Sequence, residues 1–386
     1  MSSLKVAMIG HGFMGAAHSQ GWRTAHRVFD LPGKPQMAVL VGRNSTNLEA
    51  DAAKWGWESS STNWREVIKR DDIDIIDIVT PGASHAEIAI AALEAGKHVL
   101  CEKPLANTVE QAERMAAAAE RAASYGVQTM VGFTYRRVPA VSFMRQLIQQ
   151  GVLGEIQQVR ASYRQDWLVD PSAPLSWRLQ QDQAGSGALG DIGAHAIDLV
   201  QFTTGLHTQQ VSGVLQTITE HRPHADGSGF GQVSVDDLAL FTGRLSNGAL
   251  ASFEASRVAT GRKNALSIEV SGSKGALAFD LEELNSLQYY NREDPPDRQG
   301  FRNILVTEPV HPYLSGWWPA GHMLGYEHGF SHQVKDLVES IHDGTPAHSS
   351  FAEGLQVQRV LDAVTRSAAT ASAWTSVGHQ AESHVV

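Results

Sequence analysis

The sequence predicts an α/β protein in which a doubly wound parallel sheet is followed by a second domain with a mainly antiparallel sheet. In the first third of the chain, apolar strands alternate with helices about every 20 to 30 residues, as a parallel sheet requires. From residue 155 onward, strand-like runs follow one another through short turns such as Ser246-Asn247-Gly248, which favours antiparallel pairing. A chain of 386 residues is long for one core, so we expect two domains, 1–135 and 136–386.

The expected first strand, residues 4–9, runs directly into a glycine pattern, and residues 16–29 then have helical character. A strand, a G-x-G-x-x-G loop and a helix in succession form the Rossmann arrangement that cradles a dinucleotide pyrophosphate. The helix N-terminus offers oriented N–H groups to that anion. We therefore expect a bound dinucleotide here; a glycine-rich turn without a ligand is the alternative. The residues expected to contact the dinucleotide are Gly10, Gly12, Phe13, Met14 and Gly15.

The end of the second expected strand, residues 37–41, bears on the choice between NAD and NADP. An Asp or Glu usually stands here to accept hydrogen bonds from the ribose 2′-hydroxyl of NAD. This chain instead continues Gly42-Arg43-Asn44. Because Arg43 could stack on adenine or pair with the 2′-phosphate of NADP, the residues alone leave the cofactor open.

Two further strand ends carry the motifs around which the first domain is organised. The expected strands 73–79 and 98–101 flank a helix over 85–95, and their ends read Thr80-Pro81 and Glu102-Lys103-Pro104. Ligands of open parallel sheets lie beyond the carboxyl ends of the strands, so Lys103 is placed to act on one. A solvated surface lysine is the alternative interpretation. The other expected elements of this domain are helices at 47–55, 64–70 and 108–125 and a strand at 127–133.

The second expected domain begins with a helix over 139–150 and holds a second constellation. Asp191 and His195 are four residues apart, so they share one face if a helix begins near Asp191. A carboxylate beside an imidazole can orient it for proton transfer, and the preceding glycines would let the backbone approach a ligand. A helix-capping Asp with an incidental His is the alternative. The expected strands are 155–166, 211–220, 234–244, 249–257, 266–271, 276–280 and 286–290, and helices over 325–342 and 351–373 follow.

Composition and charge exclude several classes of protein. The net charge of −10 argues against non-specific nucleic-acid binding, which needs a cationic face. No apolar run reaches the roughly 18 residues of a membrane helix, and the chain enters a strand at Leu4, so we expect neither membrane span nor signal peptide. The single cysteine, Cys101, suits a reducing cytoplasm. The 17 histidines show no metal-binding spacing, so we expect no metal site.

Taken together, these motifs resemble the Gfo/Idh/MocA oxidoreductases, the glucose–fructose oxidoreductase and inositol dehydrogenase family. The resemblance covers nearly the whole chain. It rests on the glycine loop, Thr80-Pro81, Glu102-Lys103-Pro104-Leu105, Tyr135-Arg136-Arg137 and the run from Gly187 to Asp198. It implies NAD as the cofactor, with NADP not excluded, and a large open-faced second sheet through which subunits form dimers or tetramers. Thr134 stands where relatives often have Asn.

The resemblance also implies site residues. Lys103, Asp191 and His195 carry over as the catalytic residues of a sugar site. The stretches Gln165-Asp166-Trp167, 261–264 and 317–322 further resemble the levoglucosan dehydrogenases of this family, which oxidise a pyranose secondary alcohol at C3. The implied cofactor contacts beyond the glycine loop are Arg43, Thr80, Pro81, His85, Glu102, Lys103, Trp177 and Arg178. The implied substrate contacts are Lys103, Tyr135, Gln165, Trp167, Asp191, His195 and His322.

The expected reaction is oxidation of a sugar or cyclic polyol by hydride transfer to the nicotinamide. His195 would act as general base, Asp191 would orient it, and Lys103 would donate to the reacting oxygen. Which of Lys103 and His195 accepts the proton stays open. An inositol dehydrogenase, an NAD-dependent glycosidase of the same fold and a non-catalytic sensor are the alternatives, although a sensor need not retain all three residues.

Overall fold

The computed structural model describes residues 3–378, which divide into two compact units. The first unit holds the chain up to Arg137 together with Gly316–Trp318 and Leu324–Leu355, and the second holds the rest. The sequence-based division at residue 135 placed the segment Leu324–Leu355 in the second domain. The structure groups it with the first because Val334, Leu337 and Val338 belong to the same buried cluster as Trp22. None of the helices among residues 3–378 is long and apolar enough to cross a membrane.

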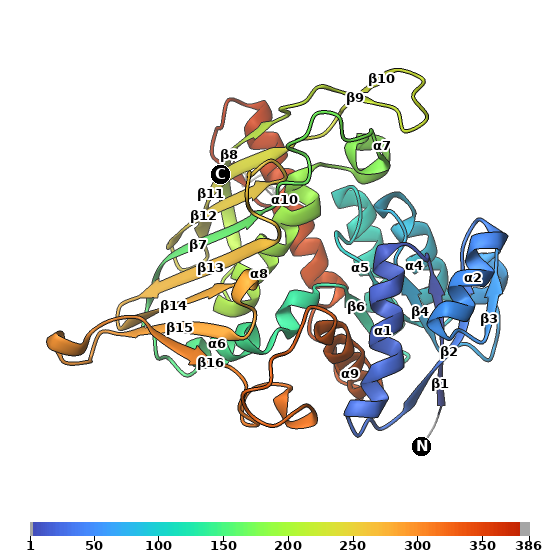
Figure 1. The fold of residues 1–386 in the computed structure, drawn as a ribbon, viewed down its shortest axis with the longest axis horizontal. Helices are drawn as coiled ribbons and strands as arrows, with labels where there is room; N and C mark the ends of the chain where they lie inside the picture. Colours follow the sequence, from blue (N-terminus) through green and yellow to red (C-terminus); the bar gives the residue numbers. More distant parts are fainter. Residues whose placement is uncertain (1–2, 379–386) are drawn as a thin grey trace, which may run out of the picture. The chain divides into compact units, whose positions relative to one another are not determined.

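The first unit is built on a six-stranded parallel sheet in the order β3-β2-β1-β4-β5-β6 (Figure 1). The chain moves outward from β1 in one direction and from β4 in the other, so the order reverses between these two strands. β4 and β5 are almost entirely buried, as expected of strands covered on both faces. The strands are β1 (Ser3–Ile9), β2 (Lys34–Val41), β3 (Ser59–Ser61), β4 (Ile75–Ile78), β5 (His98–Cys101) and β6 (Thr129–Val131).

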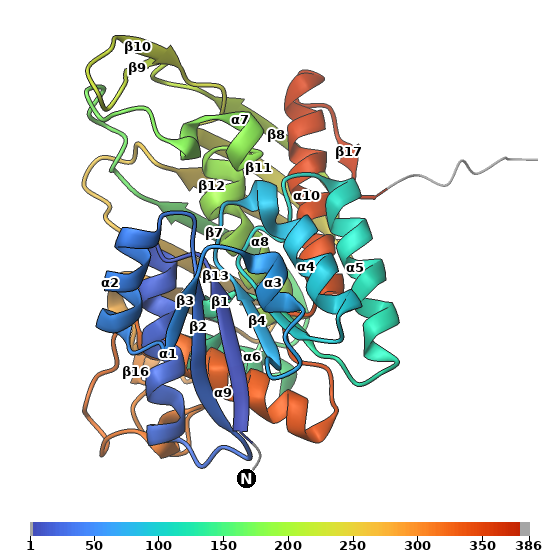
Figure 2. The ribbon, with the colours of Figure 1, turned by 90° about the vertical axis from the view of Figure 1, so that its right-hand side faces the viewer.

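Two groups of helices cover this sheet. Strand–helix–strand connections of a parallel sheet are right-handed. Because the chain runs from β1 to β3 in one direction along the sheet and from β4 to β6 in the other, α1 and α2 cover one face and α4 and α5 cover the other. α9 packs against α1 at close range, since a Cβ at Gly21 would lie 2.8 Å from the Phe330 carbonyl oxygen (Figure 2). The helices are α1 (Phe13–Val28), α2 (Ser45–Trp55), α3 (Trp64–Ile68), α4 (His85–Glu94), α5 (Val109–Ala123) and α9 (His328–Asp343), with 3₁₀ turns η1 (Gly82–Ser84) and η2 (Thr134–Arg137).

The second unit is built on a nine-stranded sheet in the order β16-β15-β14-β13-β7-β12-β11-β8-β17. All its pairings are antiparallel except that of β12 with β7, so the predicted fold class is confirmed. The strands are β7 (Ile156–Arg164), β8 (Thr208–Gln216), β11 (Leu238–Leu245), β12 (Leu250–Ser256), β13 (Ala265–Gly272), β14 (Gly275–Asp280), β15 (Ser286–Asn291), β16 (Arg302–Leu305) and β17 (Thr375–Ser376); β9 (His221–Pro223) and β10 (Phe230–Gln232) form a separate hairpin.

One face of the nine-stranded sheet is covered by α8, which packs on β7, β12 and β13 and also contacts α6. Alternate strand residues point away from this layer and are exposed; Arg160 and Glu269, for example, form a cross-strand ion pair with side chains 54% and 40% exposed. The helices of this unit are α6 (Pro139–Gln149), α7 (Gln181–Ala184), α8 (Ala194–Thr204) and most of α10 (Phe351–Ala369). Its short helical turns are η3 (Trp177–Leu179), η4 (Leu189–Gly193), η5 (Leu281–Glu283) and η6 (Pro296–Arg298), and η7 (Leu314–Gly316) begins in this unit.

Candidate active site

The glycine loop between β1 and α1 has the shape that a dinucleotide requires. Gly10 has φ +113°, and a Cβ there would lie 2.8 Å from the Val79 carbonyl oxygen. Gly12 is the N-cap of α1, carries no capping side chain and has no atom within 4 Å of a Cβ position. A Cβ at Gly15 would come within 3.0 Å of the Gly10 carbonyl oxygen. The turn, the open backbone approach and the close packing therefore fall on the three glycines as predicted, and the uncapped N–H groups of α1 fit a pyrophosphate.

The end of β2 contains a feature that the sequence did not reveal. A Cβ at Gly42 would overlap the His11 imidazole, so glycine is required where that ring lies. His11 Nδ1 is 2.7 Å from Asp51 Oδ2, a residue of α2. Arg43 is exposed beside this pair, and its predicted contact with the adenosine end of the cofactor stays a prediction.

The ends of β4 and β5 are tied together by His85. The imidazole is buried, with Nε2 2.8 Å from the Thr80 carbonyl oxygen and Nδ1 3.1 Å from that of Pro104. Burial lowers the pKa of His85, so the neutral ring donates one of these contacts. The side chain thus holds the loops that present Thr80-Pro81 and Lys103-Pro104. Its predicted contact with the cofactor itself remains a prediction.

The side chain of Glu102, the residue before Lys103, points into the core of the first unit. Its Oε1 lies 3.1 Å from His18 Nε2, while His18 Nδ1 lies 2.9 Å from Asp77 Oδ2, which also accepts from Trp22 Nε1 at 2.7 Å. Burial would lower the pKa of His18, but the two carboxylates raise it to about 10. A protonated His18 therefore bridges two buried carboxylates, and the backbone N–H of Lys103 donates to Glu102 Oε2 at 3.2 Å. This buried cluster therefore holds the backbone at the start of the loop that carries Lys103.

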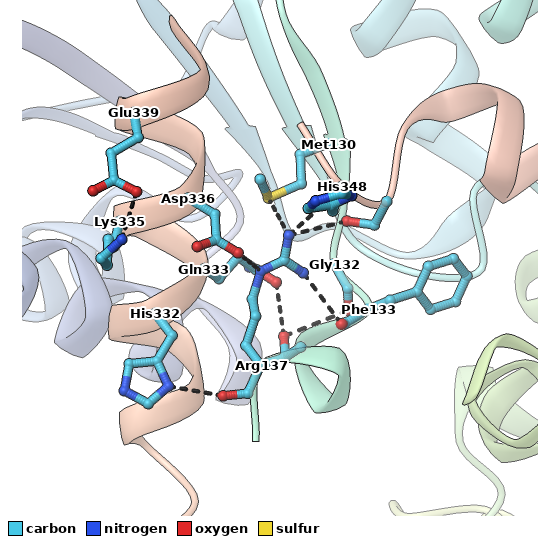
Figure 3. A network of polar contacts seen from close by, with 12 residues as sticks. Met130, Gly132, Phe133, Arg137, His332, Gln333, Lys335, Asp336, Glu339 and His348 are labelled. Carbon is cyan, nitrogen blue, oxygen red and sulfur yellow. Dashed lines mark hydrogen bonds and ion pairs between the residues drawn. The ribbon is translucent and has the colours of Figure 1, made fainter. Parts of the chain in front are cut away.

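The turn after β6, which carries Tyr135, is anchored by a buried arginine (Figure 3). Arg137 donates to Asp336 Oδ2 at 2.9 Å and to the carbonyl oxygens of Phe133 at 3.3 Å and His348 at 2.8 Å. Thr134, in the position where an Asn was expected, donates to Gln333 Oε1 at 2.9 Å. The turn is thereby bound to α9, which explains why α9 belongs to this unit.

In the second unit, Asp191 and His195 lie on a helical segment, as their spacing predicted. Asp191 is in the π-helical turn η4, and His195 is in the first turn of α8, which begins at Ala194. The Tyr163 ring of β7 lies 5.8 Å from the His195 ring, and its hydroxyl donates to Asn264 Oδ1 at 2.7 Å. The Asp191 side chain is 30% exposed, so both residues are held by the fold while Asp191 stays accessible.

Gln165 and Trp167 extend this constellation. Gln165 Nε2 donates to Asn264 Oδ1 at 2.8 Å, and Trp167 Nε1 donates to Gln165 Oε1 at 2.9 Å. Asn264, which also binds Tyr163, thus links the loop after β7 to the start of β13 and to the neighbourhood of His195. These amides and rings are the types of group that sugar hydroxyls and sugar faces bind.

The remaining predicted residues are more loosely connected. The Arg178 guanidinium lies 4.5 Å from the centre of the Trp177 ring in η3. His322 is exposed, with Nδ1 2.7 Å from the Pro319 carbonyl oxygen. Among residues 3–378, no group of three His, Cys, Asp or Glu side chains is arranged to hold a metal ion.

Family comparisons identify both units. Residues 4–133 match the model described as oxidoreductase family, NAD-binding Rossmann fold, and residues 141–278 match that of the GFO/IDH/MocA C-terminal domain. The chain is 40% identical to levoglucosan dehydrogenase of Pseudarthrobacter phenanthrenivorans over 98% of this chain and 99% of that protein. This chain belongs to the Gfo/Idh/MocA oxidoreductase family. It is an NAD-dependent oxidoreductase, so the predicted family and cofactor are confirmed.

Solved structures of family members agree with this assignment over the full length. The oxidoreductase domain protein from Kribbella flavida is 57% identical with a TM-score of 0.96, and the match covers 98% of this chain and 100% of that one. Levoglucosan dehydrogenase in complex with NADH and levoglucosan is 40% identical with a TM-score of 0.94, again over 98% and 100% of the two chains.

Within this member of the Gfo/Idh/MocA family, sequence reasoning missed the buried charges that support the motifs. His18, Asp77, Asp236 and Arg257 stand in no motif that we recognised. A histidine three residues after Gly15, on the buried side of α1, was the one available signal for the first cluster. For Asp236 and Arg257, a charged residue next to a strand with buried alternate positions was the signal.

Proposed function

We propose that this enzyme is a sugar dehydrogenase that oxidises a ring secondary hydroxyl of a pyranose or anhydro sugar of the levoglucosan type, at C3, to the ketone. The full-length similarity to levoglucosan dehydrogenase supports the proposal, and the association of Tyr163, Gln165 and Asn264 around the segment that carries His195 is the observation on which it chiefly rests. Gln165 and Asn264 are half-buried, and their amide groups are of the type that binds sugar hydroxyls.

In the proposed mechanism, His195 accepts the proton of the reacting hydroxyl. Asp191, one helical turn before it, orients the imidazole and accepts a hydrogen bond from a neighbouring hydroxyl. Lys103 donates to the reacting oxygen and stabilises its developing negative charge. NAD, when bound by the glycine loop, accepts the hydride.

A substrate screen tests this proposal. Levoglucosan, myo-inositol, glucose and xylose would each be offered with NAD and, in parallel, with NADP, and reduced cofactor would be followed at 340 nm. We expect the highest kcat/KM with levoglucosan or a related pyranose and NAD. A preference for myo-inositol would indicate an inositol dehydrogenase. Release of an aglycone from a glycoside without net NADH would indicate a glycosidase, and no turnover with any sugar would contradict the proposal.

We also propose that the enzyme works in the cytoplasm as a homo-oligomer. The buried thiol of Cys101 suits a reducing compartment. The exposed face of the nine-stranded sheet, which carries Arg160, Thr242 and Ser252 in register, is a broad surface suited to a second copy. Light scattering of the purified enzyme would give the subunit number, and a monomer would contradict this part of the proposal.

A further inference from the structure

A fully buried arginine of the second unit lies beside three of its predicted site residues. Arg257 follows β12 directly, and its backbone N–H donates to the Asp237 carbonyl oxygen at 3.0 Å. The side chain has 0% exposure. An arginine is seldom buried to this extent unless charge partners or hydrogen bonds compensate for its lost hydration.

The Arg257 guanidinium joins three loops that carry predicted site residues. Nη1 lies 3.9 Å from Asp191 Oδ2 and donates to the Arg178 carbonyl oxygen at 3.4 Å. The Trp167 ring lies 5.5 Å from the guanidinium carbon. One side chain thus contacts residues from the loop after β7, from η3 and from η4.

The neighbouring Asp236 grips the beginning of the motif that contains Asp191. Its carboxylate accepts the N–H groups of Gly187 and Leu189, each at 2.8 Å, and its carbonyl oxygen accepts that of Ala188 at 2.9 Å. The same carbonyl oxygen accepts Arg257 Nη2 at 2.8 Å. Asp236 thus links the 187–189 backbone to Arg257.

The charged groups around Arg257 suit an arginine at this position. Burial lowers the pKa of Arg257, and Asp191, Asp236 and Asp237 oppose that effect while Arg178 adds to it. Nε of Arg257 is buried without a hydrogen-bond partner. Removing one member of a buried charge cluster leaves its partners uncompensated, which is strongly destabilising. The Arg257 guanidinium thus offsets the nearby Asp191, Asp236 and Asp237 carboxylates.

We propose that Arg257 is a positioning residue for the oxidation reaction: it orients the Asp191 carboxylate and offsets its charge, and it holds the loops of Trp167 and Arg178 in place beside it. This inference rests on the proposed function, in which Asp191 orients His195 and binds a sugar hydroxyl. The charged groups that act on Arg257 are Asp191, Asp236, Asp237 and Arg178, and the titratable His195 lies one turn beyond Asp191 at the start of α8.

Two substitutions separate charge from geometry. Arg257→Lys keeps a positive charge but loses the planar fork that reaches two carbonyl oxygens and the carboxylate, whereas Arg257→Gln loses the charge. Arg222 provides matched controls, because it is also fully buried in the second unit, donates to the Leu168 and Asp170 carbonyl oxygens at 2.7 and 2.8 Å, and has an unpartnered buried Nε. Arg222→Lys and Arg222→Gln thus impose a similar packing and desolvation change without the contact to Asp191.

Steady-state kinetics would be measured for the sugar and for NAD between pH 6 and 10. For both Arg257 variants we expect kcat/KM for the sugar to fall about 10²-fold, the loss typical of a misplaced reacting group, with KM for NAD within about two-fold of wild type. In Arg257→Gln the acid limb of the sugar kcat/KM profile should move to higher pH, because the Asp191 carboxylate, no longer offset by the guanidinium, favours the protonated form of the proposed base His195. Arg257→Lys should restore that limb and leave the rate low.

Equal losses in the Arg257 and Arg222 variants, or an acid limb that does not move in Arg257→Gln, would overturn the inference while leaving the proposed function intact. Absence of turnover by the wild-type enzyme would instead contradict the proposed function. A crystal structure of Arg257→Gln gives a readout that does not depend on turnover. The inference expects the Asp191 carboxylate to be displaced there and unchanged in Arg222→Gln; an unmoved carboxylate in Arg257→Gln would overturn it.

Discussion

At the scale of single residues, the surroundings of a buried histidine decide whether its ring is neutral or protonated. His332 is neutral by geometry, since Nδ1 must donate to the Arg137 carbonyl oxygen at 2.8 Å while Nε2 accepts from Trp317 at 2.7 Å. Burial lowers the pKa of His332 to about 3. His18 is equally buried, but two carboxylates hold it protonated. His195, one turn beyond Asp191, is half-buried and is the histidine proposed to exchange a proton.

Replacement of His195 tests that assignment. His195→Ala removes the proposed base, so kcat/KM for the sugar should fall by about 10²- to 10⁴-fold, the usual contribution of general acid–base catalysis. NADH affinity, followed by quenching of protein fluorescence, should stay within about two-fold of wild type. His207→Ala, at an exposed position just after α8, serves as the control and should turn over normally. Near-normal turnover of His195→Ala would remove this residue from the mechanism.

The packing at Gly187 allows a second prediction at this scale. A Cβ there would overlap the Asp236 carbonyl oxygen and would lie 2.8 Å from Arg257 Nη2. Gly187→Ala should therefore destabilise the protein by about 1–3 kcal/mol, as overpacking does, and reduce sugar turnover more than NAD binding. Gly300→Ala, where a Cβ would meet no atom within 4 Å, is the control. Wild-type melting temperature and turnover in Gly187→Ala would contradict the described backbone.

Residue types at fixed spacing single out Gly10, Lys103, Asp191 and His195 as candidates, because their chemistry is tied to a local pattern. Arg257 could not be found in this way. Its partners Asp191 and Arg178 are distant in sequence, and their meeting depends on how η3, η4 and β12 pack. A charged residue next to a strand is more often a solvated one, so the sequence offered no reason to prefer the buried alternative.

At the scale of elements, α9 shows how a buried ion pair attaches a helix to a sheet. Arg137 is 1% exposed and Asp336 is 17% exposed, and the guanidinium also satisfies two carbonyl oxygens between β6 and the loop before α10 (Figure 3). The contacts of Gln333 with Thr134 and of His332 with the Arg137 carbonyl oxygen lie on the same helix. The helix is therefore fixed to the Tyr135 turn along two of its turns.

Loss of the Arg137 anchor should lower the free energy of unfolding by several kcal/mol. Arg137→Gln leaves Asp336 and the two carbonyl oxygens without their donor, and removing one partner of a buried pair typically costs about 3–5 kcal/mol. Lys335→Gln on the same helix breaks a half-exposed pair with Glu339 and should cost no more than about 0.5 kcal/mol. Urea unfolding of both variants measures the difference. A cost below 1 kcal/mol for Arg137→Gln would show that the pair contributes little.

Elements were predicted well where apolar periodicity was strong. The strand at 98–101 and the helix at 139–150 agree with β5 and α6 to within a residue. β3, with the sequence Ser-Ser-Ser, and the short strands β9, β10, β16 and β17 were missed, because each is held by backbone pairing to a neighbour and carries little apolar signal. The helix α9 was found, but its unit was not, since the amphipathic pattern does not say which sheet its apolar face covers.

At the scale of the whole molecule, the two buried histidines, one protonated and one neutral, predict how stability depends on pH. His18 has a folded pKa of about 10, above its ordinary value of 6.5. The folded chain therefore binds one more proton than the unfolded chain between these values. Its contribution is complete below pH 6.5 and is lost as the pH rises toward 10. His332 has a folded pKa of about 3, below 6.5, so its contribution is present above pH 6.5 and is lost as the pH falls toward 3.

From these two groups we expect the free energy of unfolding to be greatest near neutral pH and to fall on both sides, each with a limiting slope of about 1.4 kcal/mol per pH unit. Urea unfolding between pH 5 and 9.5, followed by the fluorescence of buried Trp22 and Trp57, measures both limbs. His18→Gln should flatten the alkaline limb and leave the acid limb, whereas His332→Gln should do the reverse because the two histidines have separate partners. If either variant is too unstable to titrate, proton release on unfolding the wild-type chain at pH 8.5 gives the same sign for His18. An alkaline limb that stays as steep in His18→Gln as in wild type would show that His18, in the buried cluster with Asp77 and Glu102, is not protonated as described.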